Sequence, residues 1–214
     1  MRFNIHAGHN PDGKIACGAV GIIKESTEAR LVKNEVIRLL REAGHTVHDC
    51  TVDDGVSQNN VLSKIVEKCN SNAVDYDISI HFNAGNGNGT EAYVYPGDDK
   101  SKKMADAICA SIAKLGFKNR GTKDNRELYV LRRTKSSAIL VECCFVDSST
   151  DVSKYKASEM AFAIASALDT TIARKQTATD SLYRVQVGAF SKKENAEKLL
   201  IELAAKGFKG FITK

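Results

Sequence analysis

Two hydrophobic spacings alternate along residues 1–172. In short runs the apolar side chains fall at every second position, which is typical of β-strands, and in longer runs they recur every three to four positions, which is typical of amphipathic helices. The pattern predicts strands at residues 2–6, 46–52, 76–82, 91–95, 128–131 and 138–145, and helices at residues 26–43, 56–69, 102–115 and 153–172. Strands that alternate with helices imply an α/β fold, with a mainly parallel, twisted sheet flanked by helices on both faces.

A different pattern begins after this first domain of residues 1–172. Residues 173–181 are polar and have no apolar periodicity, as in a linker. Residues 182–214 then have the pattern of a small β-α-β half-module, whose helix opens with a capping box formed by Ser191 and Glu194. We expect its strands at residues 182–190 and from residue 208 to residue 212.

A half-module of this size is too small to bury a core of its own, because domains below about 40 residues usually need outside help. Its helix and its first strand each have an apolar face, formed by Ala196, Leu199, Leu200 and Leu203 and by Tyr183, Val185 and Val187. Three sources of cover are open: a second repeat further along the natural chain, the first domain, or a second copy of the chain. We favour a homodimer through residues 182–214, because a two-fold axis supplies the missing repeat.

Composition and charge exclude several classes of protein. The hydrophobic share of 43% and the charged share of 27% are those of an ordinary globular protein. The net charge of +5 is mild and no run of Lys and Arg is dense, so no nucleic-acid partner is expected. No stretch has the length of a membrane span and no apolar signal segment follows Met1. We therefore expect no membrane association, and a chain made and retained in the cytoplasm until something releases it.

Three residues that can bind a metal lie at the predicted edge of the sheet. His9 follows the first strand, His81 lies at the end of the central strand, and Glu25 lies at the start of the first long helix. Ligands collect at the carboxyl ends of parallel strands. Two histidines and one carboxylate leave the fourth position of a tetrahedral zinc ion open to water, as hydrolysis requires. From spacing alone, ordinary surface or core roles stay open for all three residues.

Glu142 is a carboxylate inside the apolar run of residues 138–145. Burying a charge without a partner is costly, so this residue needs an explanation. It is either one half of a buried salt bridge or a general acid/base held beside a metal, and the residues alone leave both open. The neighbouring Cys143 and Cys144 are expected to be small buried hydrophobic residues. All six cysteines are expected to be reduced, since none forms a CxxC pair.

Four motifs occur in the order and at roughly the spacing of one enzyme family. They are Ala7-Gly8-His9, the segment from Gly21 to Glu25, Ser79-Ile80-His81-Phe82-Asn83 with Gly89-Thr90-Glu91, and the segment from Leu140 to Phe145. With these motifs, residues 1–172 resemble the zinc-dependent N-acetylmuramoyl-L-alanine amidases, the catalytic domains of many autolysins and endolysins. The resemblance implies that His9, Glu25 and His81 are zinc ligands and that Glu142 is the catalytic glutamate.

Two neighbouring residues compete for these assignments. Glu28 lies one helical turn beyond Glu25, but the distance from Glu25 to Gly44 resembles the helix length of the family. His6 precedes the Gly-His motif and alternates with Phe3 and Ile5 along the strand. It should therefore point to the sheet face opposite to theirs, beside Asn4, and have a structural role.

The resemblance implies hydrolysis of the amide bond between N-acetylmuramic acid and L-alanine in peptidoglycan. A zinc-activated water would attack, and Glu142 would accept its proton and return it to the departing amine. Asn83 falls on the same strand face as His81 and is a candidate for binding the substrate or its tetrahedral intermediate. Two alternatives stay open: a zinc peptidase that cuts within the stem peptide, and a non-catalytic wall-binding protein, against which the presence of Glu142 counts.

The tail carries a second resemblance. Its string from Val185 to Phe190, VQVGAF, is similar to the opening of a SPOR domain, a module that binds peptide-free glycan strands. Such modules usually have two β-α-β repeats, and only one is present here. The resemblance implies glycan binding through residues 182–214. The enzyme would then act on the cell wall after release, either by a phage holin or by lysis of a sporulating mother cell.

Overall fold

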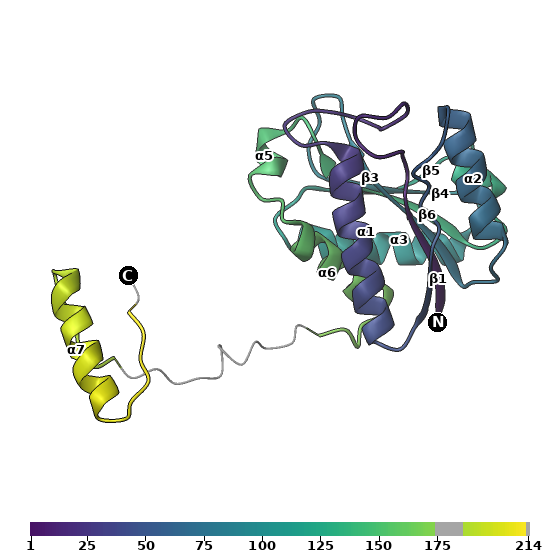
Figure 1. Ribbon diagram of the computed structural model, residues 1–214. Coiled ribbons are helices and arrows are strands. Elements are labelled where there is room, and N and C mark those ends of the chain that lie inside the picture. Colours follow the sequence, from purple (N-terminus) through teal and green to yellow (C-terminus); the bar gives the residue numbers. More distant parts are fainter. Residues whose placement is uncertain (174–185, 213–214) are drawn as a thin grey trace. The chain divides into compact units, whose positions relative to one another are not determined.

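A six-stranded sheet forms the centre of the N-terminal part of the chain. The computed structural model describes residues 1–173 and 186–212 (Figure 1). The strands are β1 (Arg2–Ala7), β2 (Thr46–Asp49), β3 (Tyr76–Asn83), β4 (Thr90–Val94), β5 (Asn119–Asp124) and β6 (Ala138–Phe145). They lie in the order β2-β1-β3-β6-β4-β5. The first four strands in this order are parallel to one another. β4 runs antiparallel to β6, and β5 runs parallel to β4. The predicted α/β class with a mainly parallel sheet is confirmed.

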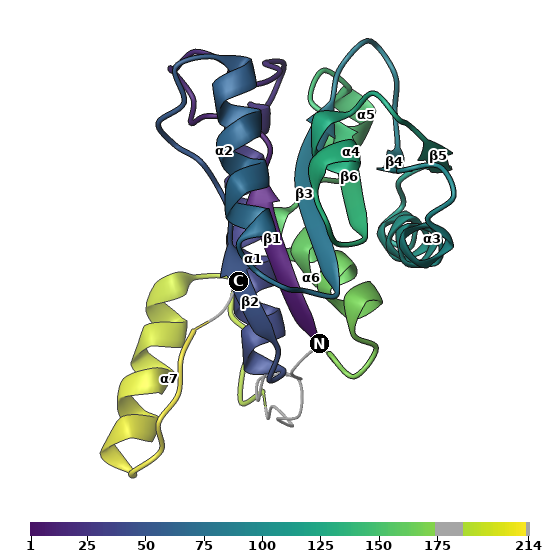
Figure 2. The ribbon, with the colours of Figure 1, turned by 90° about the vertical axis from the view of Figure 1, so that its right-hand side faces the viewer.

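Helices cover both faces of this sheet. They are α1 (Glu25–Glu42), α2 (Gln58–Asn70), α3 (Asp99–Ala113), α4 (Tyr129–Arg133), α5 (Ser149–Val152) and α6 (Ala157–Leu168). One core lies under α1, α3 and α6, and a smaller one lies under α2 and α4. Figure 2 shows α2 and α4 in front of the sheet and α1 and α6 behind it. The two-sided cover explains why most strand positions are buried.

Each strand sends alternate side chains to the two faces, and this decides where the polar groups gather. In β1, Phe3 and Ile5 join the larger core, whereas Asn4 points to the other face and hydrogen-bonds the carbonyl of a residue in α2. His6 shares the face of Asn4, as its alternation with Phe3 and Ile5 predicts. In β3 the same alternation places His81 on the face of His6.

Two of the elements predicted for residues 1–172 differ from those in the structure. Residues 128–131 were expected to form a strand but enter helix α4, because the Asn125 side chain accepts hydrogen bonds from the N–H groups of Glu127 and Leu128 and turns the chain. The long helix expected at residues 153–172 is shorter in the structure, where only α6 (Ala157–Leu168) forms within that range. The separate short helix α5 precedes it, and the Ser148 hydroxyl caps its start. The pattern also missed β5, an edge strand whose sequence, NRGTKD, has no apolar alternation.

The chain divides into two compact units, Met1–Arg174 and Lys175–Lys214. In the second, helix α7 (Lys193–Ala205) forms where a helix was expected, and Gly207 beyond its end has a φ of 85°. The expected strands are not formed at residues 186–190 and 208–212, and residues 182–185 lie outside the described residues. A two-stranded sheet with one helix is marginal in water, which accounts for the missing strands.

The apolar side of α7 is only partly covered within the described part of its unit, where the chain at Gly188 lies close to Leu199 and the chain at Gly210 lies close to Leu200. No residue of α7 is buried, and Ile201 together with Phe208 and Phe211 beyond the helix is exposed. None of the helices that the structure describes is long and apolar enough to cross a membrane.

Candidate metal and catalytic site

Three side chains from different elements converge at the carboxyl ends of β1 and β3. His9 follows β1, Glu25 is the first residue of α1, and His81 lies near the end of β3. The Nδ1 atom of His81 is 2.9 Å from Glu25 Oε1, and the Nε2 atom of His9 is 3.3 Å from the same oxygen. One ligand atom from each residue lies within 4.8 Å of the other two. The structure therefore brings together the three residues that the sequence singled out for metal binding.

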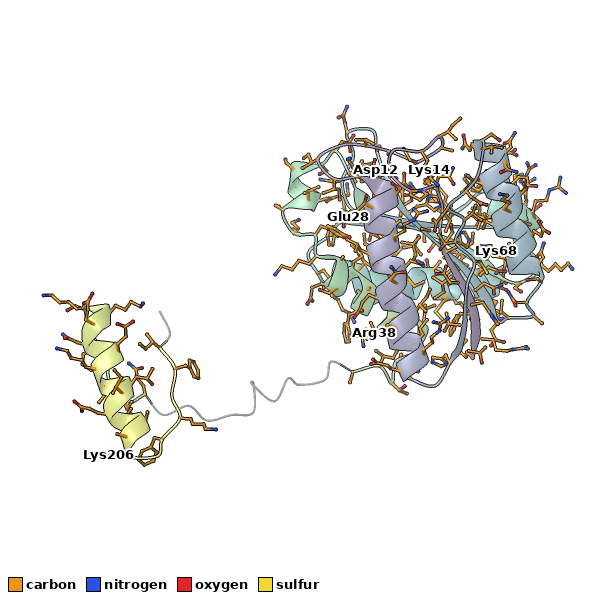
Figure 3. All side chains as sticks on the ribbon, in the orientation of Figure 1. Asp12, Lys14, Glu28, Arg38, Lys68 and Lys206 are labelled. Atoms are coloured by element: carbon orange, nitrogen blue, oxygen red, sulfur yellow. The ribbon has the colours of Figure 1, made fainter. Side chains whose placement is uncertain are left out.

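Backbone groups fix the Glu25 carboxylate in this position. Its Oε2 accepts a hydrogen bond from the Ala19 N–H at 2.8 Å, and its Oε1 accepts one from the Phe82 N–H at 3.1 Å. The competing residue Glu28, on the same helix (Figure 3), instead accepts a hydrogen bond from the Tyr155 hydroxyl at 2.9 Å. Glu28 is thus occupied away from the two histidines.

His6 lies close to this cluster without joining it. Its Nδ1 is 3.4 Å from the Ser79 hydroxyl, and the imidazole is fully buried. Burial, followed by the nearby His81, lowers the pKa of His6 to about 3. A neutral, buried imidazole packed against the sheet agrees with the structural role expected for it.

Two glycines leave the space that the site occupies. A Cβ atom on Gly8 would lie 1.8 Å from Nε2 of His81, and one on Gly18 would lie 2.5 Å from Oε2 of Glu25 and 2.8 Å from Cδ2 of His9. Gly18 also has a φ of 80°, which side chains disfavour. The loop between β1 and α1 can close over the three side chains only because both positions lack a Cβ.

The protonation states of the cluster suit a cation. Burial alone would raise the pKa of Glu25, but hydrogen bonds from His81 and His9 lower it well below its usual range. Burial lowers the pKa of His81 more than the contact with Glu25 raises it. One carboxylate with two imidazoles is the donor set that zinc binds, and the spacing of the donors allows one ion to reach all three.

Glu142 lies beside this cluster on β6. It is the register partner of His81 on one side and of Glu91 in β4 on the other. Its Oε2 atom is buried and has no hydrogen-bond partner among the described residues. Burial, followed by repulsion from Glu25 and Glu91, raises the pKa of Glu142 to about 8. Such a group exchanges a proton near neutral pH, and no salt bridge of Glu142 is present in the described part of the chain.

Glu91 gathers four hydrogen-bond donors on the same face of the sheet. Its Oε2 accepts from Arg120 Nε and from Lys123 Nζ, each at 2.6 Å. Its Oε1 accepts from Asn83 Nδ2 and from the Tyr93 hydroxyl, each at 2.8 Å. Burial would raise the pKa of Glu91, but these donors, Lys123 and Arg120 foremost, lower it to about 2. Arg120 and Lys123 had no signal in the sequence, because both lie on the edge strand β5 that the hydrophobic pattern missed. Glu91 belongs to one of the four motifs, but its own role is apparent only from these contacts.

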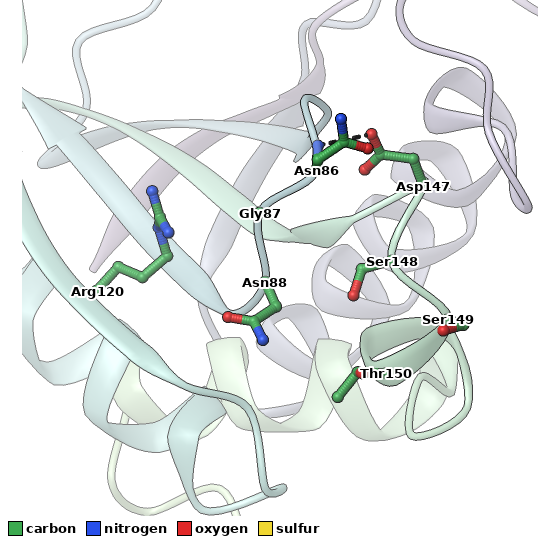
Figure 4. Close-up of a pocket in the computed structure, with 8 residues that line it drawn as sticks. All are labelled: Asn86, Gly87, Asn88, Arg120, Asp147, Ser148, Ser149 and Thr150. Carbon is green, nitrogen blue, oxygen red and sulfur yellow. Dashed lines mark hydrogen bonds between the residues drawn. The ribbon is translucent and has the colours of Figure 1, made fainter.

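Next to Arg120 a polar cavity opens at the end of the sheet where β3 and β6 finish (Figure 4). Its volume is about 390 Å³. It is lined by three segments far apart in sequence, whose residues are Asn86, Gly87 and Asn88, then Arg120, then Asp147, Ser148, Ser149 and Thr150. Asp147 holds the first of these segments by accepting a hydrogen bond from the Asn86 N–H at 3.0 Å.

The cysteines take no part in this arrangement. All six are free thiols, and five of them are buried. Burial raises the pKa of Cys143, and it raises the pKa of Cys109 to about 11. Thiols held this firmly in the protonated form are poor nucleophiles.

Comparison with known proteins identifies the family. A family model described as N-acetylmuramoyl-L-alanine amidase matches residues 4–174. The chain belongs to this amidase family. A SPOR domain model matches residues 156–214 and overlaps the end of the amidase match. Both resemblances seen in the sequence are thereby confirmed.

Several curated relatives in the amidase family are cell-wall enzymes. The N-acetylmuramoyl-L-alanine amidase CwlM of Bacillus licheniformis is 36% identical over 156 residues, which cover 71% of this chain and 61% of that protein. The sporulation-specific N-acetylmuramoyl-L-alanine amidase of Bacillus subtilis is 34% identical over 157 residues, with the same coverage of 71% and 61%. The endolysin of Bacillus phage SPP1 is 31% identical and the match covers 71% of this chain and 57% of that one. The chain spans about three fifths of the length of these relatives.

Solved structures share the amidase fold. The catalytic domain of the CD27L endolysin, which targets Clostridia Difficile, superposes with a TM-score of 0.73 at 27% identity, covering 78% of this chain and 96% of that one. The catalytic domain of CwlV, an N-acetylmuramoyl-L-alanine amidase from Bacillus (Paenibacillus) polymyxa, gives 0.67 at 23% identity, with 79% and 97% covered. The sheet and its helices are therefore those of an amidase catalytic domain.

Proposed function

We propose that the protein hydrolyses the amide bond between N-acetylmuramic acid and L-alanine in peptidoglycan, with a zinc ion held by His9, Glu25 and His81. The observation that carries this proposal is the convergence of these three side chains beside Glu142, whose buried oxygen has no hydrogen-bond partner among the described residues. Membership of the amidase family supports the choice of substrate.

The three ligand residues fit zinc in donor chemistry and in spacing. When bound, zinc supplies a Lewis acid that polarises the scissile carbonyl and makes water more acidic. The chain itself positions one of the ligands, because the Ala19 and Phe82 N–H groups orient the Glu25 carboxylate.

Glu142 acts as the general base and then as the general acid. Its unpartnered Oε2 takes up the proton of the attacking water and delivers it to the departing amine of L-alanine. A pKa raised to about 8 allows the carboxyl to take up and release a proton near neutral pH. Asn83 gives one amide hydrogen to Glu91, which fixes the amide and leaves its other hydrogen for the substrate or its tetrahedral intermediate.

The C-terminal unit has a separate role in this proposal. The match to a SPOR domain supports glycan binding through residues 182–214, which would keep the enzyme on the wall between cuts. Release to the wall takes place when the cell lyses, by a holin or with a sporulating mother cell. The relatives include an endolysin and a sporulation-specific amidase, so they support both routes.

The test combines metal analysis with analysis of wall digests. The purified protein should contain one zinc ion per chain, and digestion should release new amino groups on L-alanine while the glycan stays intact. New amino groups on other stem-peptide residues would instead identify a peptidase, and no release at all would identify a wall-binding protein.

Two variants separate metal binding from proton transfer. His81→Ala should lose zinc and activity together, because it removes one of three ligands. Glu142→Gln should keep its zinc and its melting temperature but lose roughly 10²- to 10⁴-fold in rate, as expected for a lost general acid/base. Full zinc content in His81→Ala would contradict the ligand assignment, and near-normal wall lysis by Glu142→Gln would contradict its catalytic role.

A further inference from the structure

The two cations bound to Glu91 exceed the charge that this residue can neutralise. Arg120 and Lys123 both contact one carboxylate oxygen, and Asn83 and Tyr93 saturate the other. One carboxylate facing two cations leaves one net positive charge in the group. Glu91 has no room for a further donor. Asp151 also acts on Arg120, but through its charge and without a hydrogen bond to the guanidinium among the described residues, so the terminal nitrogens of Arg120 can still attract an anion from outside.

The cations, and not the carboxylate, face the solvent. The Glu91 side chain is 2% exposed, whereas the side chains of Arg120 and Lys123 are 30% and 42% exposed. Both cations lie on β5, beside β4, and Glu91 in β4 is the register partner of Glu142. The positive charge therefore lies on the side of Glu142 away from His81, within the same face of the sheet.

The two terminal nitrogens of the Arg120 guanidinium, which form a fork, have no partner among the described residues. Among the described residues Arg120 uses only Nε, toward Glu91, so both terminal nitrogens can bind a carboxylate in the two-pronged geometry typical of arginine. Its guanidinium is held 5.1 Å above the Phe145 ring, and Gly87 allows this, because a Cβ there would lie 2.4 Å from that ring.

The cavity beside Arg120 has the polarity and the size of a substrate subsite. Amide side chains of Asn86 and Asn88 line one wall, and hydroxyls of Ser148 and Thr150 line the opposite one (Figure 4). A volume of about 390 Å³ is within the range of small-molecule sites. An elongated substrate lying across Glu142 can thus extend past Arg120 into this space.

We infer that Arg120 and Lys123 bind a carboxylate of the stem peptide, with Glu91 as the residue that positions them. This inference rests on the proposed amidase function. The acidic group must come from the peptide side of the scissile bond, because the lactyl carboxyl group of muramic acid is itself consumed in the amide. The pair therefore favours peptides with a free carboxylate close to L-alanine over peptides in which that group is amidated.

The experiment compares two glycan fragments that differ in one group. One carries a stem tripeptide with D-glutamate at the second position and the other the same tripeptide with D-isoglutamine there, so that the γ-carboxyl is in a peptide bond in both and only the α-carboxylate differs. The values of kcat and KM are measured for each with the zinc-loaded, full-length protein. We expect kcat/KM to be about 10- to 100-fold higher for the acid, the range of a hydrogen bond to a charged group. The difference should reside in KM, because the contact is made before and during the reaction.

Three variants test the assignment. Arg120→Lys keeps the charge next to Glu91 but loses the fork, and Lys123→Gln removes one charge, so each should reduce the preference for the acid at least several-fold. The matched control is Lys103→Gln, which removes an exposed lysine from α3 and should leave both kcat/KM values unchanged.

Equal kcat/KM values of the wild-type protein on the two fragments, or an undiminished preference in both Arg120→Lys and Lys123→Gln, would overturn the inference. Failure of the wild-type protein to cut either fragment would instead count against the proposed function. Because Arg120→Lys retains a cation for Glu91, a preserved melting temperature in this variant separates loss of recognition from loss of folding.

Discussion

Two glutamates on one face of the sheet have opposite hydrogen-bonding environments. Glu91 accepts four hydrogen bonds, two of them from cations, and its pKa falls to about 2. Oε2 of its register partner Glu142 accepts none from the described residues, and the pKa of Glu142 rises to about 8. The same side chain thus serves as a fixed charge in one place and as a proton carrier in the other, because the number of donors around it differs.

The low pKa of Glu91 predicts a specific loss of stability in acid. A carboxyl whose folded-state pKa lies below its usual value of 4.5 stabilises the fold above pH 4.5, and that contribution disappears as the pH falls toward 2. The contribution is at most about 3 kcal/mol, because Arg120 and Lys123 remain partly exposed to water. The free energy of unfolding, measured in urea, should therefore fall more steeply from about pH 5 to about pH 3 in the wild-type protein than in Glu91→Gln. Parallel curves for the two proteins would show that Arg120 and Lys123 do not lower the pKa of Glu91.

Among the elements, the loop between β1 and α1 carries the strictest steric requirements. It brings His9 against Glu25, and Arg30 of α1 holds it by donating a hydrogen bond to the His9 carbonyl at 2.7 Å. At Gly18 the chain passes so close to Glu25 that no side chain fits. The loop has no regular secondary structure of its own, and its shape is set by these contacts with α1 and β3.

Gly13 and Gly18 offer a matched test of this requirement. Both have a φ of 80°, but a Cβ on Gly13 would meet nothing within 4 Å, whereas one on Gly18 would meet Glu25 and His9. Gly13→Ala and Gly18→Ala should therefore both cost about 1 kcal/mol through backbone strain. Only Gly18→Ala should also weaken zinc binding, measured by competition with a chelator. Equal zinc affinity in the two variants would show that the loop can move aside without disturbing the ligands.

For the whole molecule, the main unsatisfied apolar surface among the described residues lies in the C-terminal unit. Helix α7 has no buried residue, and Phe208 and Phe211 beyond it are exposed. Apolar surface of this kind seeks a partner in water. The pairing of two copies through residues 182–214 stays our prediction.

This prediction has a direct measurement. The full-length protein should sediment as a dimer, and a chain that ends at Ile172 should sediment as a monomer and still cut the wall, because the amidase core is complete without the tail. A monomeric full-length protein would exclude the pairing. A dimeric shortened chain would place the interface in the amidase unit.

Elements with a strong local period, and the residues at their ends, can be predicted from the sequence alone. The alternation in β1 places His6 with Asn4 and away from Phe3, and the helical period of α1 fixes the start at which Glu25 lies. Such features follow from side-chain geometry within one element. This geometry placed His9, Glu25 and His81 at one edge of the sheet, and the resemblance of their motifs to the amidase family singled them out together with Glu142.

Features that depend on neighbouring strands are apparent only in the folded chain. β5 has no apolar alternation and is a strand because β4 pairs with it, and residues 128–131 are helical because Asn125 turns the chain. Arg120 and Lys123 come to Glu91 from that strand, 29 and 32 positions away in sequence. The cationic group and the polar cavity were therefore beyond reach of the sequence, because no local period records which polar side chains a sheet will place side by side.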